Sequence, residues 1–224
     1  LIITHKEIPF IRRKLKFLKE YHIITHSGSI ASVVEKKWIS LYMVSDSRCK
    51  GDKYIPFTSR NFLHPSFQKR EVDLSSLLEK YNLPKLDNID FLYVSRCIEL
   101  KEPFRVLNNF KRSKKVCVMV ILAQNKLDPY YQKFLREDKG SVIVIDTHNL
   151  EIKNDIYKGF TSEELSVFYN SAKVYVHASE QEGESRTIQE ALSCGCLVMA
   201  KKGMEGGGID YLNDQNSILY TGEN

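Results

Sequence analysis

The sequence has 224 residues, of which 42% are hydrophobic and 27% are charged, and its formal net charge is +5 at pH 7. This balance is typical of a globular protein and excludes an intrinsically disordered chain. The positive charge is too small and too dispersed to indicate a nucleic-acid-binding protein, although it favours an anionic ligand such as a nucleotide diphosphate.

The cysteine pattern predicts free thiols. Five cysteines occur in the chain, and none of their spacings resembles a zinc ribbon. No apolar run approaches the roughly 20 residues that a membrane-spanning helix needs. We therefore expect a protein of a reducing, cytoplasmic compartment.

The N-terminal part begins as alternating strand and helix. Short apolar runs at 2–4 and 22–25 predict strands, and apolar residues recur between them at helical spacing. The opposite face of that helix is basic and carries Arg12, Arg13, Lys16 and Lys19. A solvated face over a core stripe is the favoured interpretation, while peripheral contact with a membrane surface is the alternative.

The following residues predict the domain organisation. A further strand is expected at 39–44, followed by a polar loop and Tyr54-Ile55-Pro56. Residues 57–88 are irregular apart from a helix near Leu74–Tyr81, which is typical of a connection between domains. We predict a partial N-terminal α/β segment at 1–60, an interdomain linker at 61–88 and a Rossmann-like domain at 89–224.

The third region reads as an α/β domain with a Rossmann-like parallel sheet flanked by helices. Strands are predicted at 90–94, 116–122, 142–145, 174–177, 197–200 and 217–220, and helices at 103–112, 128–137, 162–171 and 186–194. Thr161 and Glu164 form the capping-box pattern at the start of one helix. Such sheets bind their ligands at the carboxyl ends of the strands.

The segment EGESRTIQE, residues 182–190, lies where this rule places a ligand. It follows a predicted strand and opens a helix, so the amides after Gly183 can form a helix N-terminus that attracts phosphate. Glu182 and Glu190 lie at the turn and about two turns further on. Each carboxylate can accept hydrogen bonds from vicinal hydroxyls of a sugar or a ribose.

Two further groups lie at the same predicted edge. Arg96 and Lys101 follow the strand 90–94 and could together neutralise a diphosphate. The glycine-rich stretch 203–208 predicts a flexible loop that passes close to a ligand, and its Glu205 either touches that ligand or is solvated. His177, at a strand end, is interpreted as a core histidine.

These motifs resemble a known family. E-x7-E followed by ALSCGCLVMA resembles glycosyltransferase family 4 (glycosyl transferases group 1), the retaining GT-B enzymes, and VSRCIELK resembles that family's strand, Arg and Lys. The segments YKGFTSEELSVFYNSAKVYVHAS and DYLNDQNSILY resemble the stretches that lie between and after these motifs. The resemblance covers residues 90–220 in the family's order, with the GT-B C-terminal domain preceded by the tail of an N-terminal domain.

The resemblance implies roles for individual residues. Arg96 and Lys101 would hold the diphosphate, Glu182 the donor sugar and Glu190 the ribose. Backbone amides would hold the donor sugar and phosphate at Gly183, Glu184, Ser185 and Arg186. The resemblance implies a UDP- or GDP-sugar as co-substrate, with no cofactor and no metal, and the sequence contains no D-x-D triplet.

The chain departs from the family pattern in places. Ser95 stands where the family usually has Gly, Ala123-Gln124 where it has a Gly-rich pair, and Glu184-Ser185 where it has an aromatic residue and Gly. Only about 60 residues precede the linker, and the sequence ends before the family's closing helices, so we expect a chain truncated at both ends.

The resemblance implies a retaining transferase that moves a hexose to a sugar or lipid-linked acceptor, as in polysaccharide biosynthesis. Two alternatives stay open. One is a non-catalytic nucleotide-sugar-binding module or degenerate glycosyltransferase subunit that works with a partner. The other is a GT-B sugar epimerase, which shares the sheet but not this motif set.

Overall fold

A computed structural model describes residues 63–122, 125–150 and 159–221, together with three short strands nearer the N-terminus. These strands are β1 (Ile23–Thr25), β2 (Tyr42–Val44) and β3 (Tyr54–Pro56), and they form a parallel sheet in that order. The strands expected at 22–25 and 39–44 are confirmed, whereas β3 was not predicted as a strand. The strand expected at 2–4 and the basic helix after it lie outside the described residues.

The described residues divide into two compact units. One contains β1 to β3 and residues 181–186 and 205–211; the other contains the described residues of 63–180, 187–204 and 212–221. We call the second the sheet unit. Residues 63–88 belong to it rather than to a separate body, and the domain boundaries at 60 and 88 stay a prediction.

A six-stranded parallel sheet organises the sheet unit and confirms the predicted Rossmann-like α/β class. The strand order is β11-β9-β7-β4-β5-β6, and every neighbouring pair is parallel. The strands are β4 (Ile89–Arg96), β5 (Cys117–Leu122), β6 (Ile143–Asp146), β7 (Ala172–His177), β9 (Leu197–Lys201) and β11 (Ser217–Tyr220). Each predicted strand of this domain is present, with ends shifted by at most two residues.

The helices begin where the sequence offers caps. Asp73 and Asp128 accept backbone N–H groups at the starts of α3 and α5, and the capping box of Thr161 and Glu164 is formed at the start of α6. The helices are α3 (Leu74–Lys80), α4 (Pro103–Arg112), α5 (Pro129–Arg136), α6 (Ser162–Ser171) and α7 (Arg186–Ser193), with short 3-10 turns η2 (Glu99–Lys101), η3 (Thr147–Asn149) and η4 (Ile209–Tyr211). No helix among the described residues is long and apolar enough to cross a membrane.

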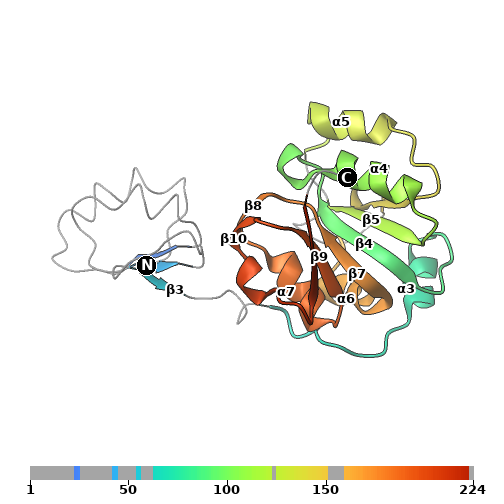
Figure 1. The fold of residues 1–224 in the computed structure, drawn as a ribbon. Helices are drawn as coiled ribbons and strands as arrows, with labels where there is room; N and C mark the ends of the chain where they lie inside the picture. Colours follow the sequence, from blue (N-terminus) through green and yellow to red (C-terminus); the bar gives the residue numbers. More distant parts are fainter. Residues whose placement is uncertain are drawn as a thin grey trace. The chain divides into compact units, whose positions relative to one another are not determined.

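The two faces of the sheet bury different side chains, because successive strand residues point to opposite sides. On one face Tyr93 and Met119 pack with Phe110 of α4 and Phe134 of α5, and Figure 1 shows these two helices together beside β4 and β5. On the other face α6 contacts β4 and β7. Both faces of β4 are therefore covered, which explains its nearly continuous apolar sequence.

Glu164 joins α3 to α6. Its Oε1 accepts hydrogen bonds from Lys80 Nζ at 2.6 Å and Tyr81 Oη at 2.5 Å, while Oε2 accepts the N–H of Thr161 at 2.8 Å. Burial by itself raises the pKa of Glu164, but the hydrogen bonds from Lys80 and Tyr81 outweigh it and leave the pKa below its ordinary value. The carboxylate form is thus the one that the fold stabilises.

Replacing Glu164 should therefore give a pH-dependent loss of stability. We expect Glu164→Gln to lower the free energy of unfolding at pH 7 by about 1.5–3 kcal/mol, the scale of hydrogen bonds to a charged group. Because the folded-state pKa is lowered, the wild-type advantage is present above the ordinary pKa of 4.5 and is lost as the pH falls further. Urea unfolding at pH 7 and pH 3 measures it, with Glu79→Gln, an exposed change on α3, as the control. An equal difference at both pH values would contradict this account.

Gly195 ends α7 in a left-handed turn. Its φ is +83°, and the N–H of Cys196 returns to the carbonyl of Ala191 at 2.9 Å, as in a Schellman motif. A Cβ at this position would lie 2.9 Å from Cδ of Lys69. The positive φ therefore favours glycine, and a larger residue would also have to displace the exposed side chain of Lys69.

Two glycine substitutions should differ in sign. Gly195→Ala should destabilise the fold by about 1–2 kcal/mol, since a left-handed conformation is strained for alanine. Gly159→Ala should be neutral or slightly stabilising, because a Cβ there meets nothing within 4 Å. Thermal melting of the two variants decides the matter, and equal melting temperatures would show that the turn at Gly195 relaxes without cost.

Candidate active site

The carboxyl ends of the parallel strands meet at one edge of the sheet. Arg96 is in register with Leu122, and Asp146 with Ile121, so the ends of β4, β5 and β6 lie side by side. His177 is likewise in register with Ala200. The strand order runs outward from β4 to β6 and then, in the opposite direction, from β7 to β11. The reversal between β4 and β7 is the point at which sheets of this type form a ligand crevice.

Arg96 is the last residue of β4 and is exposed at this edge of the sheet. The chain then turns back through Cys97, which is fully buried, and its burial raises the thiol pKa to about 12. The residues before and after Arg96, Ser95 and Cys97, are both buried and hold the end of the strand in place. The guanidinium is thus presented at the ligand edge by a fixed backbone.

Lys101 lies at the end of η2, five residues after Arg96. The hydroxyl of Tyr93 donates a 2.9 Å hydrogen bond to the carbonyl of Lys101, which ties this turn back to β4. The next residue, Glu102, has a φ of 55° and is paired with Arg105 at 3.0 Å. A left-handed non-glycine residue costs energy, so the surrounding contacts must fix the turn. Arg96 and Lys101 therefore belong to one anchored loop.

Arg105 strengthens the same edge from α4. Its guanidinium donates to the carbonyl of Ala178 at 3.2 Å and to the hydroxyl of Tyr220 at 3.3 Å. It thus connects the segment after β7 with the end of β11. This clamp was not expected from the sequence, where Arg105 is one of several basic residues of an amphipathic helix.

Glu182 lies in a strand rather than in a loop. Residues Gln181–Glu184 form β8, which pairs in parallel with β10 (Glu205–Gly207), and Glu182 is in register with Gly206. Gln181 donates a 3.3 Å hydrogen bond to Glu205. The prediction of a flexible loop at 203–208 is therefore partly wrong, because its central residues form a strand. The glycines of that strand let its backbone lie against the segment that carries Glu182.

Helix α7 begins where the sequence predicts it, and its N-terminus is defined by the structure. It starts at Arg186, which is exposed, after Ser185, which is buried. Gly183 and Glu184 belong to β8, so the helix N-terminus is not formed by their amides. The N–H groups of the first helical turn are those from Arg186 onward. The roles of the backbone amides at 183–186 in holding the donor sugar and phosphate stay predictions.

Glu190 is buried on α7, with 8% of its surface exposed. The hydroxyl of Tyr169, on α6, donates a 3.2 Å hydrogen bond to its Oε2. The pKa of the Cys194 thiol is raised to about 11, first by burial and second by the charge of the Glu190 carboxylate. Glu190 is thus not a solvated helix residue, the ordinary alternative for a glutamate at such a position.

Two other titratable groups are buried at the carboxyl edge. Asp146 accepts a 2.5 Å hydrogen bond from the hydroxyl of Tyr131, and burial followed by this bond raises the pKa of that phenol. His177 is 3% exposed, with Nδ1 3.5 Å from the hydroxyl of Tyr175. The interpretation of His177 as a core histidine agrees with its burial.

The predicted site residues fall into two groups. Arg96, Lys101 and Glu190 belong to the sheet unit, whereas residues 182–186 belong to the other unit together with β10. Within the sheet unit the structure places Arg96 and Lys101 on one loop. The joint geometry of the two groups stays a prediction.

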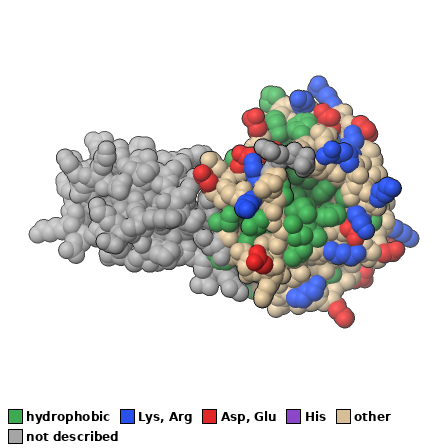
Figure 2. Space-filling view, in the orientation of Figure 1, with side chains coloured by type: hydrophobic (Ala, Val, Ile, Leu, Met, Phe, Trp, Pro, Cys, Tyr) green, Lys and Arg blue, Asp and Glu red, His purple; other side chains and the backbone are tan. Residues whose placement is uncertain are grey.

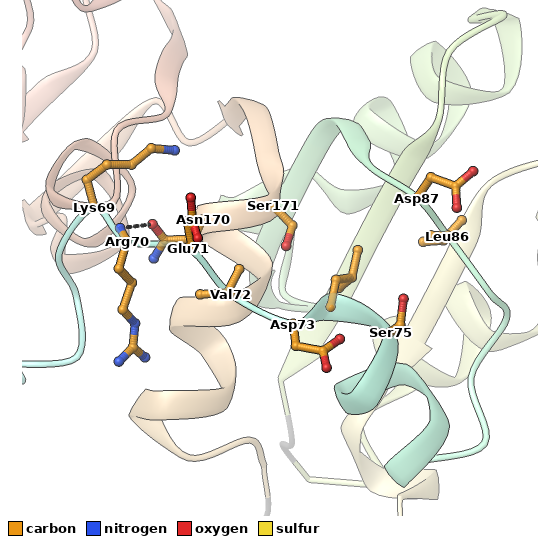
Figure 3. A pocket seen from close by; sticks show the side chains of 11 residues that line it. Lys69, Arg70, Glu71, Val72, Asp73, Ser75, Leu86, Asp87, Asn170 and Ser171 are labelled. Carbon is orange, nitrogen blue, oxygen red and sulfur yellow. Dashed lines mark hydrogen bonds between the residues drawn. The ribbon is translucent and has the colours of Figure 1, made fainter.

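A cavity of about 800 Å³ lies away from these residues. Figure 3 shows its lining, which comes from the segment 69–75, from Leu86 and Asp87 before β4, and from Asn170 and Ser171 before β7. Asn170 also accepts the N–H of Arg70 at 2.9 Å. Because residues that precede the strands line it, this cavity lies at the amino edge of the sheet and is not the candidate donor site.

A smaller cavity, of about 260 Å³, lies on the face covered by α4. It is lined mainly by apolar side chains of the sheet and of α4, among them Phe91, Phe110, Val176 and Met199. Figure 2 shows hydrophobic side chains gathered on the visible face of this unit, with Lys and Arg side chains around them. Among the residues that the structure describes, no three His, Cys, Asp or Glu side chains are grouped as a metal site would require.

Comparison with solved structures finds glycosyltransferases of the same architecture. A glycosyltransferase from Rickettsia africae ESF-5 is 16% identical, with a TM-score of 0.56 over 100% of this chain and 55% of that one. Sucrose-phosphate synthase from Thermosynechococcus elongatus is 17% identical, with a TM-score of 0.59 over 97% and 58% of the two chains. A UDP-forming α,α-trehalose-phosphate synthase from Burkholderia xenovorans is 11% identical, with a TM-score of 0.62 over 98% and 61%.

The chain therefore spans between half and two thirds of the length of these three proteins, and at such identities the likeness concerns the fold. A comparison with curated proteins found no match. The family model described as glycosyl transferases group 1 matches residues 77–221, which include the whole six-stranded sheet, Arg96, Lys101 and the E-x7-E segment. The resemblance seen in the sequence is confirmed, and the chain belongs to the family of glycosyl transferases group 1.

Proposed function

We propose that this chain is the donor-binding part of a retaining glycosyltransferase that transfers a hexose from a UDP- or GDP-sugar to a sugar or lipid-linked acceptor. The observation that carries the proposal is the anchored loop with Arg96 and Lys101 at the reversal point of the sheet. Two cations at that edge suit a diphosphate. One of the similar structures is UDP-forming, which favours uridine for the nucleotide.

The chemistry proposed for this site is electrostatic. Departure of the nucleoside diphosphate places negative charge on its oxygens, and cations already held in position stabilise that charge without reorganisation. Arg96 offers a planar pair of donors and Lys101 a compact charge. In a front-face mechanism the leaving phosphate itself receives the proton of the attacking hydroxyl, while the protein fixes the sugar. Glu182 would take that second task.

The proposal needs no metal ion, since Arg96 and Lys101 can supply the positive charge that a metal supplies elsewhere. A nucleotide-sugar-binding module or degenerate subunit is the second candidate. The departure from the family pattern at Ser95 favours it, because a buried serine side chain occupies a position beside Arg96 where the family usually has glycine. Binding experiments test what the two candidates share, and sugar-transfer assays separate them.

The first measurement is calorimetry of the 224-residue chain with UDP and GDP. We expect a dissociation constant below about 1 mM for at least one nucleotide, which corresponds to about 4 kcal/mol of binding free energy. The affinity should be the same in magnesium and in EDTA. Absence of binding at millimolar nucleotide, or binding that requires the metal, would refute the proposed donor site.

The second measurement concerns Arg96. Hydrogen bonds to a charged group contribute about 1.5–3 kcal/mol, so Arg96→Ala should weaken nucleotide diphosphate binding by roughly 10-fold or more. The melting temperature should hardly change, because Arg96 is exposed. Arg136→Ala is the matched control: this arginine is also exposed but ends α5, at the opposite edge of the sheet. If both variants bind equally well, Arg96 is an ordinary surface residue.

A further inference from the structure

Glu190 is held by a residue that the family pattern does not single out. Tyr169 is fully buried on α6, 21 positions earlier in the chain, and its hydroxyl reaches Oε2 of Glu190 at 3.2 Å. The terminal torsion of a glutamate is broad, so a free carboxylate would sample many orientations. A hydrogen bond to one oxygen restricts that rotation and fixes the direction of the other oxygen.

The donor is itself immobilised. The ring of Tyr169 packs edge-on against Phe67 and Tyr175, with centroids 6.0 and 5.6 Å away. Its backbone carbonyl accepts the thiol of Cys196 at 3.0 Å. Burial raises the pKa of the phenol well above 10, so the hydroxyl stays protonated and can donate throughout the physiological range. Tyr169 thus has a fixed position and a constant hydrogen-bonding role.

We propose that Tyr169 is a positioning residue that aims the carboxylate of Glu190 at the ribose hydroxyls of the donor nucleotide. This inference rests on the proposed function, in which Glu190 contacts the ribose. A ribose presents two vicinal hydroxyl donors, and only a carboxylate with a defined orientation can accept both. Orientation before binding also lowers the entropy cost of binding, as with any preorganised group.

A merely structural hydrogen bond predicts something different. If Tyr169 only supported α6 and α7, its loss would lower stability and weaken all nucleotides alike. If it orients Glu190, its loss should weaken only nucleotides that carry the hydroxyls. The readout is therefore the ratio of affinities for UDP and 2′-deoxy-UDP, which global destabilisation does not change.

The experiment compares the 224-residue wild type with Tyr169→Phe and Glu190→Gln by calorimetry. We expect the wild type to prefer UDP over 2′-deoxy-UDP by about 10-fold, the scale of one hydrogen bond to a charged group. Both variants should lose most of that preference: their affinity for UDP should fall more than their affinity for 2′-deoxy-UDP, which keeps only the 3′-hydroxyl. Replacing the Tyr169 hydroxyl by an amino group, as para-aminophenylalanine, restores a donor and should restore the preference.

Tyr81→Phe is the control, because it removes another tyrosine–glutamate hydrogen bond to α6, at Glu164, outside the site. It should lower stability and keep the ribose preference. If Tyr169→Phe does not fold, para-fluorophenylalanine at 169 replaces it, since fluorine matches the hydroxyl in size without donating a hydrogen bond.

The outcomes separate the inference from the function on which it rests. Retained preference in Tyr169→Phe, or equal loss of both nucleotides, overturns the positioning role alone. A wild type that binds UDP without ribose preference, or a Glu190→Gln variant that keeps it, overturns the role of Glu190 while the donor site stands. A wild type that binds neither UDP nor GDP overturns both proposals.

Discussion

The parallel pairing of the six strands is the constraint from which the candidate site follows. Parallel pairing brings the ends of β4, β5 and β6 to one edge, in the registers of Arg96 with Leu122 and of Ile121 with Asp146. Connections of one hand then place helices on opposite faces once the strand order reverses between β4 and β7. The strand order alone sets the position of that reversal, and the side chains decide which chemical groups lie at it.

Helix bounds were predicted well where local sequence signals, such as a capping residue or a proline, determine them. The bounds of α4 and α6 agree with the expected ranges, because Pro103 starts the first helix and the Thr161 capping box the second. Strand β10 was missed because a run of glycines has no alternating pattern. Its partner β8 is short and polar, and their pairing depends on tertiary contacts rather than on local sequence.

The site was predictable as positions but not as contacts. The strand ending at Arg96 and the spacing to Lys101 could be read from the sequence, as could membership in the family. The hydrogen bond from Tyr93 to the carbonyl of Lys101 could not, since an inward-pointing tyrosine in an apolar strand is ordinary core. The burial of Glu190 could not be predicted either, because the side of α7 that becomes buried depends on where α6 packs. A tyrosine at a buried helix position, such as Tyr169, does not by itself predict a functional role. The structure is needed to show that its hydroxyl donates to Glu190.

The burial of Glu190 is the strongest reason to treat α7 as more than a scaffold. A carboxylate with 8% exposure is unfavourable unless hydrogen bonds compensate for its lost hydration. The hydroxyl of Tyr169 supplies one such bond. The charge of the Glu190 carboxylate also raises the pKa of the Cys194 thiol, in addition to the effect of burial. The end of the same helix is fixed by the turn at Gly195. The hydrogen bond from a neighbouring helix and the fixed end of α7 restrict the Glu190 carboxylate, and this rigidity supports the ribose contact that we propose for it. For packing alone, an apolar side chain of similar size would serve at lower cost.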